Sequence, residues 1–368
     1  MQALFATLLC ISFLLPSTAL AQNEVVLDVH AIYKARVTAV ADQQTITLPG
    51  TQTTAQVQTL TAQLLEGPHK GTEVVFENDY TQLALGDKFY LRHITNDLDQ
   101  TSFYSVADPD RLPVLAILLA LFIFLIFIFG GIQGVRGLAS LCGSILLIFY
   151  LLLPGIYDGY SPILVSIGVA SLIIVVGSYI THGFNKTTSA AVLGMLGTVC
   201  ITGVAAYVAM DAANLSGFTS DESVYLNFDT GGNISMVGLL FGGIMIGLLG
   251  VLYDMAIGQA VAVEELFAAG SLTPAEVYRR AIRIGREHIG ALVNTLAIAY
   301  VGAALPLLLL LQSSDNSMLF ILNKEVFATE IVRILIGSIG LILAVPITTA
   351  IAAFVLVGKP RGAHAHKH

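Results

Sequence analysis

The sequence predicts a polytopic α-helical membrane protein with a small exported β domain at its N-terminus. Hydrophobic residues make up 55% of the chain, above the roughly 45–50% that is usual for soluble domains, and only 11% are charged. The mean hydropathy is +0.80, and the apolar residues gather in long segments after residue 112. No basic patch of the nucleic-acid-binding kind is present, so we expect the lipid bilayer and no nucleic acid as a partner.

Residues 1–21 are predicted to be a signal peptide. An apolar core runs from Leu4 to Leu15, and Pro16 breaks it before the Ala19-Leu20-Ala21 cleavage pattern. Because no Lys or Arg precedes the apolar core, an uncleaved anchor is left open. A removed signal peptide places the following segment outside the cell.

Residues 22–111 are expected to form an extracytoplasmic β-rich domain. Stretches rich in β-branched and aromatic residues alternate with turn signals such as Gly67-Pro68 and Gly86-Asp87. The expected strands lie at 25–40, 54–67, 71–78, 87–94 and 101–107. This spacing predicts a small barrel or sandwich similar to an OB-fold, which by itself implies no ligand. Asp108-Pro109-Asp110-Arg111 is expected to be a short linker.

Residues 112–358 are expected to form the transmembrane domain. Seven apolar segments approach the roughly 20 residues that a spanning helix needs. They are 113–131, 137–154, 161–182, 189–210, 234–256, 289–311 and 331–357. A last segment, 359–368, is expected to be a cytoplasmic tail whose histidines form no defined metal site.

The basic residues predict the direction of the spans. With residues 22–111 outside, the loops assigned to the cytoplasm hold almost all of the Lys and Arg of the transmembrane domain, as the positive-inside rule requires. The largest outer loop, 211–233, is acidic and is interpreted as a solvated loop or as a vestibule that gathers cations. The chain is therefore expected in the cytoplasmic membrane with its C-terminus inside.

The segment GVLYDMAIGQAVAVEELF, 250–267, places acidic residues at the end of a glycine-rich span. The glycine spacing before it lets another helix approach closely, so this span is expected to be packed centrally. Asp254 and Glu265 are eleven residues apart and so only about 20° apart around a helix. An acid at membrane depth costs about 2.5–3.5 kcal/mol, which makes Asp254 a candidate for a transport pathway or, alternatively, a marker of the membrane interface.

A second helix is predicted to start directly after this span. Thr273-Pro274-Ala275-Glu276 is a capping box with proline at the first helical position. Arg279, Arg283 and Arg286 follow on one face. They are interpreted as lipid-facing charges, or as gating charges that pair with Asp254, Glu264 and Glu265 across a short turn.

Polar residues inside the sixth span complete the candidate pathway. Asn294, Thr295 and Tyr300 are candidate ligands of a solute, or groups that hydrogen-bond between helices. Pro306 is expected to kink this span. No P-loop, GxSxG, HExxH or CxxC motif is present, so no catalytic residue, metal or cofactor is predicted and an enzyme is not expected.

The chain resembles the YibE/F family of bacterial membrane proteins over about residues 22–357. The resemblance is carried by GVLYDMAIGQAVAVEEL and above all by IGREHIGALVNTLAIAYVGAALPLLLLL. Where family members have a more hydroxyl-rich stretch after the acidic residue, this chain has Met255-Ala256-Ile257-Gly258-Gln259. The resemblance implies location and architecture and no established substrate.

The sequence is compatible with two functions of different classes. The first is a permease or channel-like transporter of a small solute or ion. The alternative is a non-transporting membrane scaffold or sensor whose exported domain binds a partner. The sequence leaves a homo-oligomer open.

Overall fold

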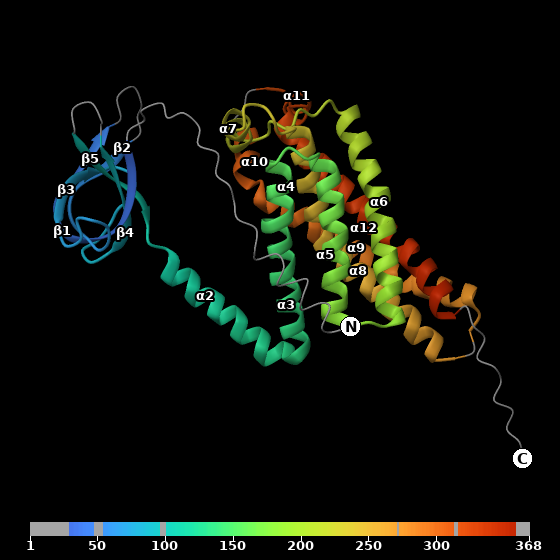
Figure 1. The fold of residues 1–368 in the computed structure, drawn as a ribbon. Coiled ribbons are helices and arrows are strands. Elements are labelled where there is room, and N and C mark those ends of the chain that lie inside the picture. Colours follow the sequence, from blue (N-terminus) through green and yellow to red (C-terminus); the bar gives the residue numbers. More distant parts are fainter. Residues whose placement is uncertain (1–28, 48–53, 96–100, 271, 313–315, 358–368) are drawn as a thin grey trace, which may run out of the picture. The chain divides into compact units, whose positions relative to one another are not determined.

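The computed structural model describes residues 29–47, 54–95, 101–270, 272–312 and 316–357. The predicted signal peptide and the His-containing tail lie outside these residues. The chain divides into two compact units, Met1–Ile123 and Phe124–His368 (Figure 1).

The first unit contains one antiparallel sheet of the five predicted strands. They are β1 (Val29–Thr47), β2 (Thr54–Leu64), β3 (Glu73–Asn78), β4 (Lys88–Thr95) and β5 (Ser102–Pro109), in the order β3-β2-β1-β4-β5. The long central strand β1 has register shifts after Val37 and Val40, and such bulges bend a strand. The edge strands β3 and β5 approach each other, so the sheet is a half-barrel and not a two-sheet sandwich.

Alternating apolar residues fill the inside of this half-barrel. Ala35, Leu60, Phe89 and Leu91 have no exposed surface, and in β3 exposed and buried residues alternate strictly. The expected linker at 108–111 is partly wrong, because Asp108 and Pro109 belong to β5. Asp110 is also held on the sheet: its N–H donates to Lys88 O (3.0 Å), and its carboxylate lies 2.6 Å from Lys34 Nζ.

The apolar chain that follows begins with a helical run, Leu112–Tyr157. It comprises α2 (Leu112–Leu125), the π-helical turn η1 (Ile126–Gly130), α3 (Gly131–Leu147), the π-helical turn η2 (Ile148–Leu152) and α4 (Leu153–Tyr157). Gly131 interrupts the helical path between the first two predicted spans with φ +51° and ψ −143°. A positive φ is readily adopted only by glycine, so residue 131 is suited to this break.

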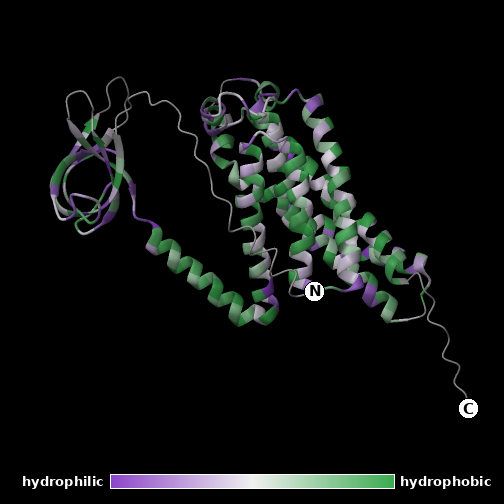
Figure 2. Cartoon of the chain, viewed as in Figure 1, coloured by the Kyte–Doolittle hydropathy of each residue, from purple (hydrophilic) through white to green (hydrophobic). Residues whose placement is uncertain are grey.

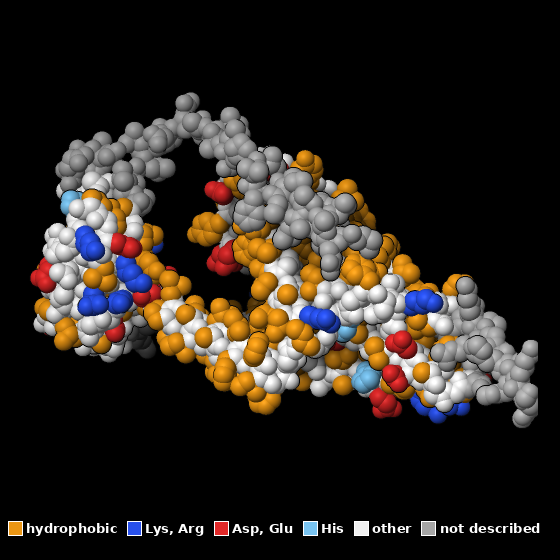
Figure 3. Space-filling view, turned by 60° about the horizontal axis from the view of Figure 1, so that its bottom comes forward, with side chains coloured by type: hydrophobic (Ala, Val, Ile, Leu, Met, Phe, Trp, Pro, Cys, Tyr) orange, Lys and Arg blue, Asp and Glu red, His pale blue; other side chains and the backbone are white. Residues whose placement is uncertain are grey.

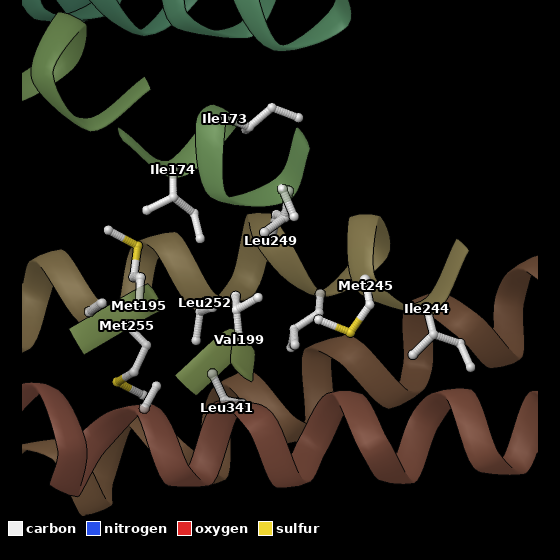
Figure 4. Close-up of a cluster of buried hydrophobic side chains, with 14 of the residues drawn as sticks. Ile173, Ile174, Met195, Val199, Ile244, Met245, Leu249, Leu252, Met255 and Leu341 are labelled. Atoms are coloured by element: carbon white, nitrogen blue, oxygen red, sulfur yellow. The ribbon is translucent and has the colours of Figure 1, made fainter. Parts of the chain in front are cut away.

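The remaining helices form a bundle around α8. They are α5 (Pro162–His182), α6 (Lys186–Ala212), α7 (Asp221–Asp229), α8 (Met236–Ala268), α9 (Pro274–Ala303), α10 (Leu305–Gln312), α11 (Met318–Leu322) and α12 (Glu325–Val357). α8 packs against α5, α6, α9 and α12, as its glycine pattern predicts. The core combines side chains of α5, α6, α8 and α12, among them Ile174, Val199, Met245 and Leu341 (Figure 4).

Five helices in the described part of the chain are long and apolar enough to cross a membrane. They are Leu112–Tyr157 taken as one run, Pro162–His182, Lys186–Ala212, Met236–Ala268 and Glu325–Leu356. Figure 2 shows that hydrophobic residues dominate these helices and that hydrophilic residues gather near their ends. These helices are compatible with a membrane protein, and the number of seven spans stays a prediction.

One local prediction in the bundle is wrong, and one helix was not predicted. The sixth predicted span is not one helix with a kink, because α9 ends at Ala303 and Pro306 stands in the first turn of α10. The acidic loop at 211–233, for which no helix was predicted, contains the short helix α7. Ser220 caps α7 and forms a capping box with Ser223.

Candidate functional site

Asp254, the residue around which the sequence analysis is built, lies on the exposed side of α8. Its neighbours Leu252 and Met255 are buried in the bundle, whereas Asp254, Gly258, Val261 and Glu265 are all exposed. The helical spacing therefore predicts their common stripe correctly. This stripe faces away from the core.

The alternative interpretation, in which the acids of α8 pair with the arginines of α9, finds no ion pair in its support among the described residues. Among the described residues the ion pairs are Lys34–Asp110, Arg111–Asp108 and Arg333–Glu330. Arg279, Arg283 and Arg286 are exposed on α9, and Glu264 and Glu265 are exposed on α8. Figure 3 shows charged side chains on a surface that is otherwise largely apolar.

The polar residues of α9 point in different directions. Asn294 is exposed and stands nine residues after the buried Gly285, about half a turn around the helix, so it points away from α8. Thr295 is also exposed, and its hydroxyl donates to Ala291 O of its own helix (2.9 Å). Only Tyr300 of the three is partly buried, and it faces the bundle.

Tyr300 belongs to a polar cluster where α8, α9 and α12 meet. A Cβ atom at Gly247 would lie 2.6 Å from the Tyr300 hydroxyl, so glycine leaves the space that this side chain occupies. The Arg333 guanidinium lies over the Tyr300 ring at 5.9 Å from its centroid. Arg333 Nη1 donates to both carboxylate oxygens of Glu330, at 2.9 and 3.2 Å.

This cluster was not predicted, because the sequence indicates Arg333 only as one of the basic residues that set the direction of the spans. A signal was available, since Glu330 and Arg333 are spaced three residues apart at the start of an apolar helix. Placing an isolated charged side chain in a spanning helix costs free energy. The cost is much smaller when the charge is paired with an opposite charge and lies over an aromatic ring.

A second buried polar contact joins the same three helices further along. Gln259 is 1% exposed and lies between Gly285 of α9 and Thr349 of α12. With the amide oriented so that both ends are satisfied, its nitrogen donates to Ala281 O (3.3 Å) and Thr349 Oγ1 (2.9 Å). Its oxygen accepts from Gly285 N (3.2 Å). From the sequence, Gln259 was noted only as part of a segment that departs from the family pattern.

Three cavities surround the end of the bundle at which α8 begins, here called the α7 end. The first, about 360 Å³, is lined by Tyr207, Asp211 and Asn214 among others. The second, about 270 Å³, lies beside Ser161 and Gly238. The third, about 250 Å³, is lined by Glu222, Gly243 and Arg333, and is here called the Arg333 cavity. None of these three is lined by Asp254.

Several buried hydroxyls inside the bundle have no hydrogen-bond partner among the described residues. They are Ser166 and Ser178 of α5, Thr202 of α6, and Thr329 and Thr348 of α12. A buried unsatisfied hydroxyl costs about 1–3 kcal/mol, so several of them in one apolar core need an explanation beyond packing.

A comparison with models of protein families identifies one family that matches this chain. The model of the YibE/F-like protein family matches residues 118–358, which is more than half of the chain. Comparisons with curated proteins and with solved structures found no match. The matched region contains the Arg333 cavity, the Tyr300 cluster and Gln259.

Proposed function

The chain belongs to the YibE/F-like protein family, and we propose that it is a permease or channel-like transporter of a small solute or ion. Its apolar helices and its family support a membrane protein. The proposed location is the cytoplasmic membrane, with the half-barrel and the α7 end outside. The arginines at the start of α9 support this direction, because basic residues favour the cytoplasmic side.

One observation carries the transport proposal: an arginine in a helix of spanning length lines a cavity at the end of the bundle. Arg333 is compensated by Glu330 and Tyr300 and still borders the Arg333 cavity. Charged residues at membrane depth usually face a route for solutes or a wet cavity. Gly243 and Gly247 continue along α8 from this cavity to the Tyr300 hydroxyl.

Asp254 is the proposed continuation of this route, which follows the exposed stripe of Gly243, Gly247 and Asp254 along α8 and not the buried core. It follows Gly247 by seven residues and therefore lies about 20° from it around α8. Gly250 and Gly258 beside it leave open space around their Cα atoms. The unpartnered hydroxyls of Ser166, Thr202 and Thr348 support a bundle that rearranges during transport, because a different packing could satisfy them.

Flux through the purified protein in liposomes tests this proposal. We expect uptake of at least one member of a broad panel of ions and small solutes. Arg333→Gln should reduce it at least tenfold and Asp254→Asn severalfold. Arg280→Gln is the matched control, because Arg280 is exposed on α9, is not among the gating candidates and makes no ion pair with the described residues. No flux for any member of the panel would remove the proposal.

A scaffold or sensor is the second candidate, favoured by the close packing of the bundle. The buried cluster that includes Val199, Met245, Leu252 and Leu341 spans α6, α8 and α12. Crosslinking in intact cells distinguishes the two functions. A scaffold predicts one reproducible protein partner on the half-barrel and no flux, whereas a transporter predicts flux from the purified chain alone. Neither function assigns a chemical reaction to the chain.

A further inference from the structure

The Arg333 cavity is lined by two residues of opposite charge and by apolar side chains. It lies between the start of α7, the first turns of α8 and the start of α12. Leu226, Leu239 and Leu240 supply apolar surface, and Ser220 and Ser223 supply hydroxyls. Glu222 and Arg333 are the charged residues that line it.

Glu222 is the anionic side of this cavity. Its pKa is lowered, first because its carboxylate accepts a hydrogen bond from its own backbone N–H and second because it accepts one from the Ser220 side chain. The carboxylate therefore stays ionised at neutral pH and attracts a cationic group. Glu222 is exposed, so a solute reaches it from water.

Arg333 is the cationic side. Its Nη1 is engaged by Glu330, but its Nε has no hydrogen-bond partner among the described residues. A guanidinium carries five N–H donors in a planar fork that suits a carboxylate. Arg333 therefore retains donor capacity after it binds Glu330.

The lining charges and the unpaired donor of Arg333 favour one class of ligand. A simple anion would meet Arg333 but also the carboxylates of Glu222 and Glu330, whereas a simple cation would pair with Glu222 and leave the free Arg333 donor without an acceptor. A molecule that carries both charges satisfies both sides. The leucines between them favour an apolar side chain on that molecule.

We propose that the Arg333 cavity binds a small zwitterion, a free α-amino acid with an apolar side chain. Its ammonium group would face Glu222, its carboxylate would face Arg333, and its side chain would lie on Leu226, Leu239 and Leu240. At about 250 Å³ the cavity has room for a molecule of this size. The inference deepens the proposed function by naming the substrate class, and it rests on that function only for the step after binding.

Calorimetric titration of the full chain in lipid nanodiscs tests the site. The probes are L-leucine, its methyl ester, which lacks the carboxylate charge, and N-acetyl-L-leucine, which lacks the ammonium charge. We expect saturable binding of leucine, at least tenfold tighter than that of either derivative. Absent leucine binding, or equal binding of either derivative, overturns the proposal.

Two variants connect the binding to this cavity. Glu222→Gln should weaken leucine binding at least tenfold. Gly243→Leu should abolish it by filling the cavity, and a Cβ atom at residue 243 meets no atom within 4 Å. Asp229→Asn, exposed at the other end of α7, is the matched control and should bind as wild type does. Unchanged affinity in both cavity variants overturns the assignment.

Reconstitution in liposomes separates this inference from the transport proposal. Leucine binding without flux of leucine or of any other solute of the panel would remove transport and leave the site. Flux through a wild-type protein that binds no leucine would remove the site and leave transport.

Discussion

Gln259 and Gly285 lie against each other where α8 crosses α9, and a Cβ atom at residue 285 would overlap the Gln259 amide. Val345 of α12 closes the same space from the third helix. The glycine thus allows a buried amide to bond with two neighbouring helices at once.

Gly285→Ala should destabilise the protein by about 1–3 kcal/mol, because an extra methyl group in a closed packing forces its neighbours apart. Thermal unfolding in detergent measures the effect. Gly290→Ala in the same helix is the control, since a Cβ atom at Gly290 meets no atom within 4 Å. The control should be neutral or slightly stabilising. Equal unfolding temperatures for the two variants would contradict the contact.

Glu325 at the start of α12 holds the loop that follows α6. Its Oε1 accepts from Ser216 N (2.6 Å) and Gly217 N (2.8 Å), and the Ser216 hydroxyl donates to the same carboxylate. Gly217 has φ +83°, and a Cβ atom there would overlap the Met236 backbone. The loop is therefore held between α8 and α12 beside the Arg333 cavity.

Glu325→Ala should increase amide hydrogen exchange at Ser216 and Gly217 at least tenfold, because hydrogen bonds to a charged group contribute about 1.5–3 kcal/mol each. Exchange followed by mass spectrometry of peptides covering 213–220 measures this. Glu264→Ala, an exposed residue of α8, should leave those peptides unchanged. Exchange as slow as in wild type would show that the carboxylate does not hold the loop.

Local signals made much of the fold predictable. The five strands follow from alternation and turns within the half-barrel. The start of α9 follows from Thr273 and Glu276, which are three residues apart and hydrogen-bond with each other. α7 was missed because its capping serines lie in a stretch that also reads as a polar loop. Sequence signals within a few residues do not distinguish a capped helix from a polar loop in this stretch.

The candidate site was less predictable because its contacts join distant segments. Gln259 gains its role from Gly285 and Thr349, on two other helices, and no spacing within α8 shows which helix faces it. The prediction for Asp254 used its depth along α8, which the sequence gives approximately. The side of α8 that faces the core depends on all its neighbours, and it is the opposite side.

The capping box at the start of α9 predicts a pH dependence. Glu276 has a lowered pKa, first because its carboxylate accepts a hydrogen bond from Thr273 N and second because it accepts one from the Thr273 hydroxyl. The folded pKa lies below the unfolded value of about 4.5, so the stabilisation is present above that pH. It is lost as the pH falls through the folded pKa.

Amide exchange in the first turn of α9 should therefore accelerate at pH 3 relative to pH 6, after correction for intrinsic rates. Glu276→Gln should exchange faster than wild type at pH 6 and lose the corrected pH dependence. Glu287→Gln, exposed on the same helix, should retain it. A wild-type first turn that is equally protected at both pH values would contradict the role of Glu276.

The contact between Gly247 and Tyr300 predicts a rescue. Gly247→Ala would place a methyl group 2.6 Å from the Tyr300 hydroxyl, the far end of a side chain that can shift, and should destabilise the protein by about 1 kcal/mol. Tyr300→Phe removes that oxygen and keeps the ring beneath Arg333, so the double variant should recover most of the loss. Gly250→Ala, where a Cβ atom meets open space, is the control. Additive effects of the two changes in thermal unfolding would mean that these residues do not touch, since contacting residues couple by about 0.5–3 kcal/mol.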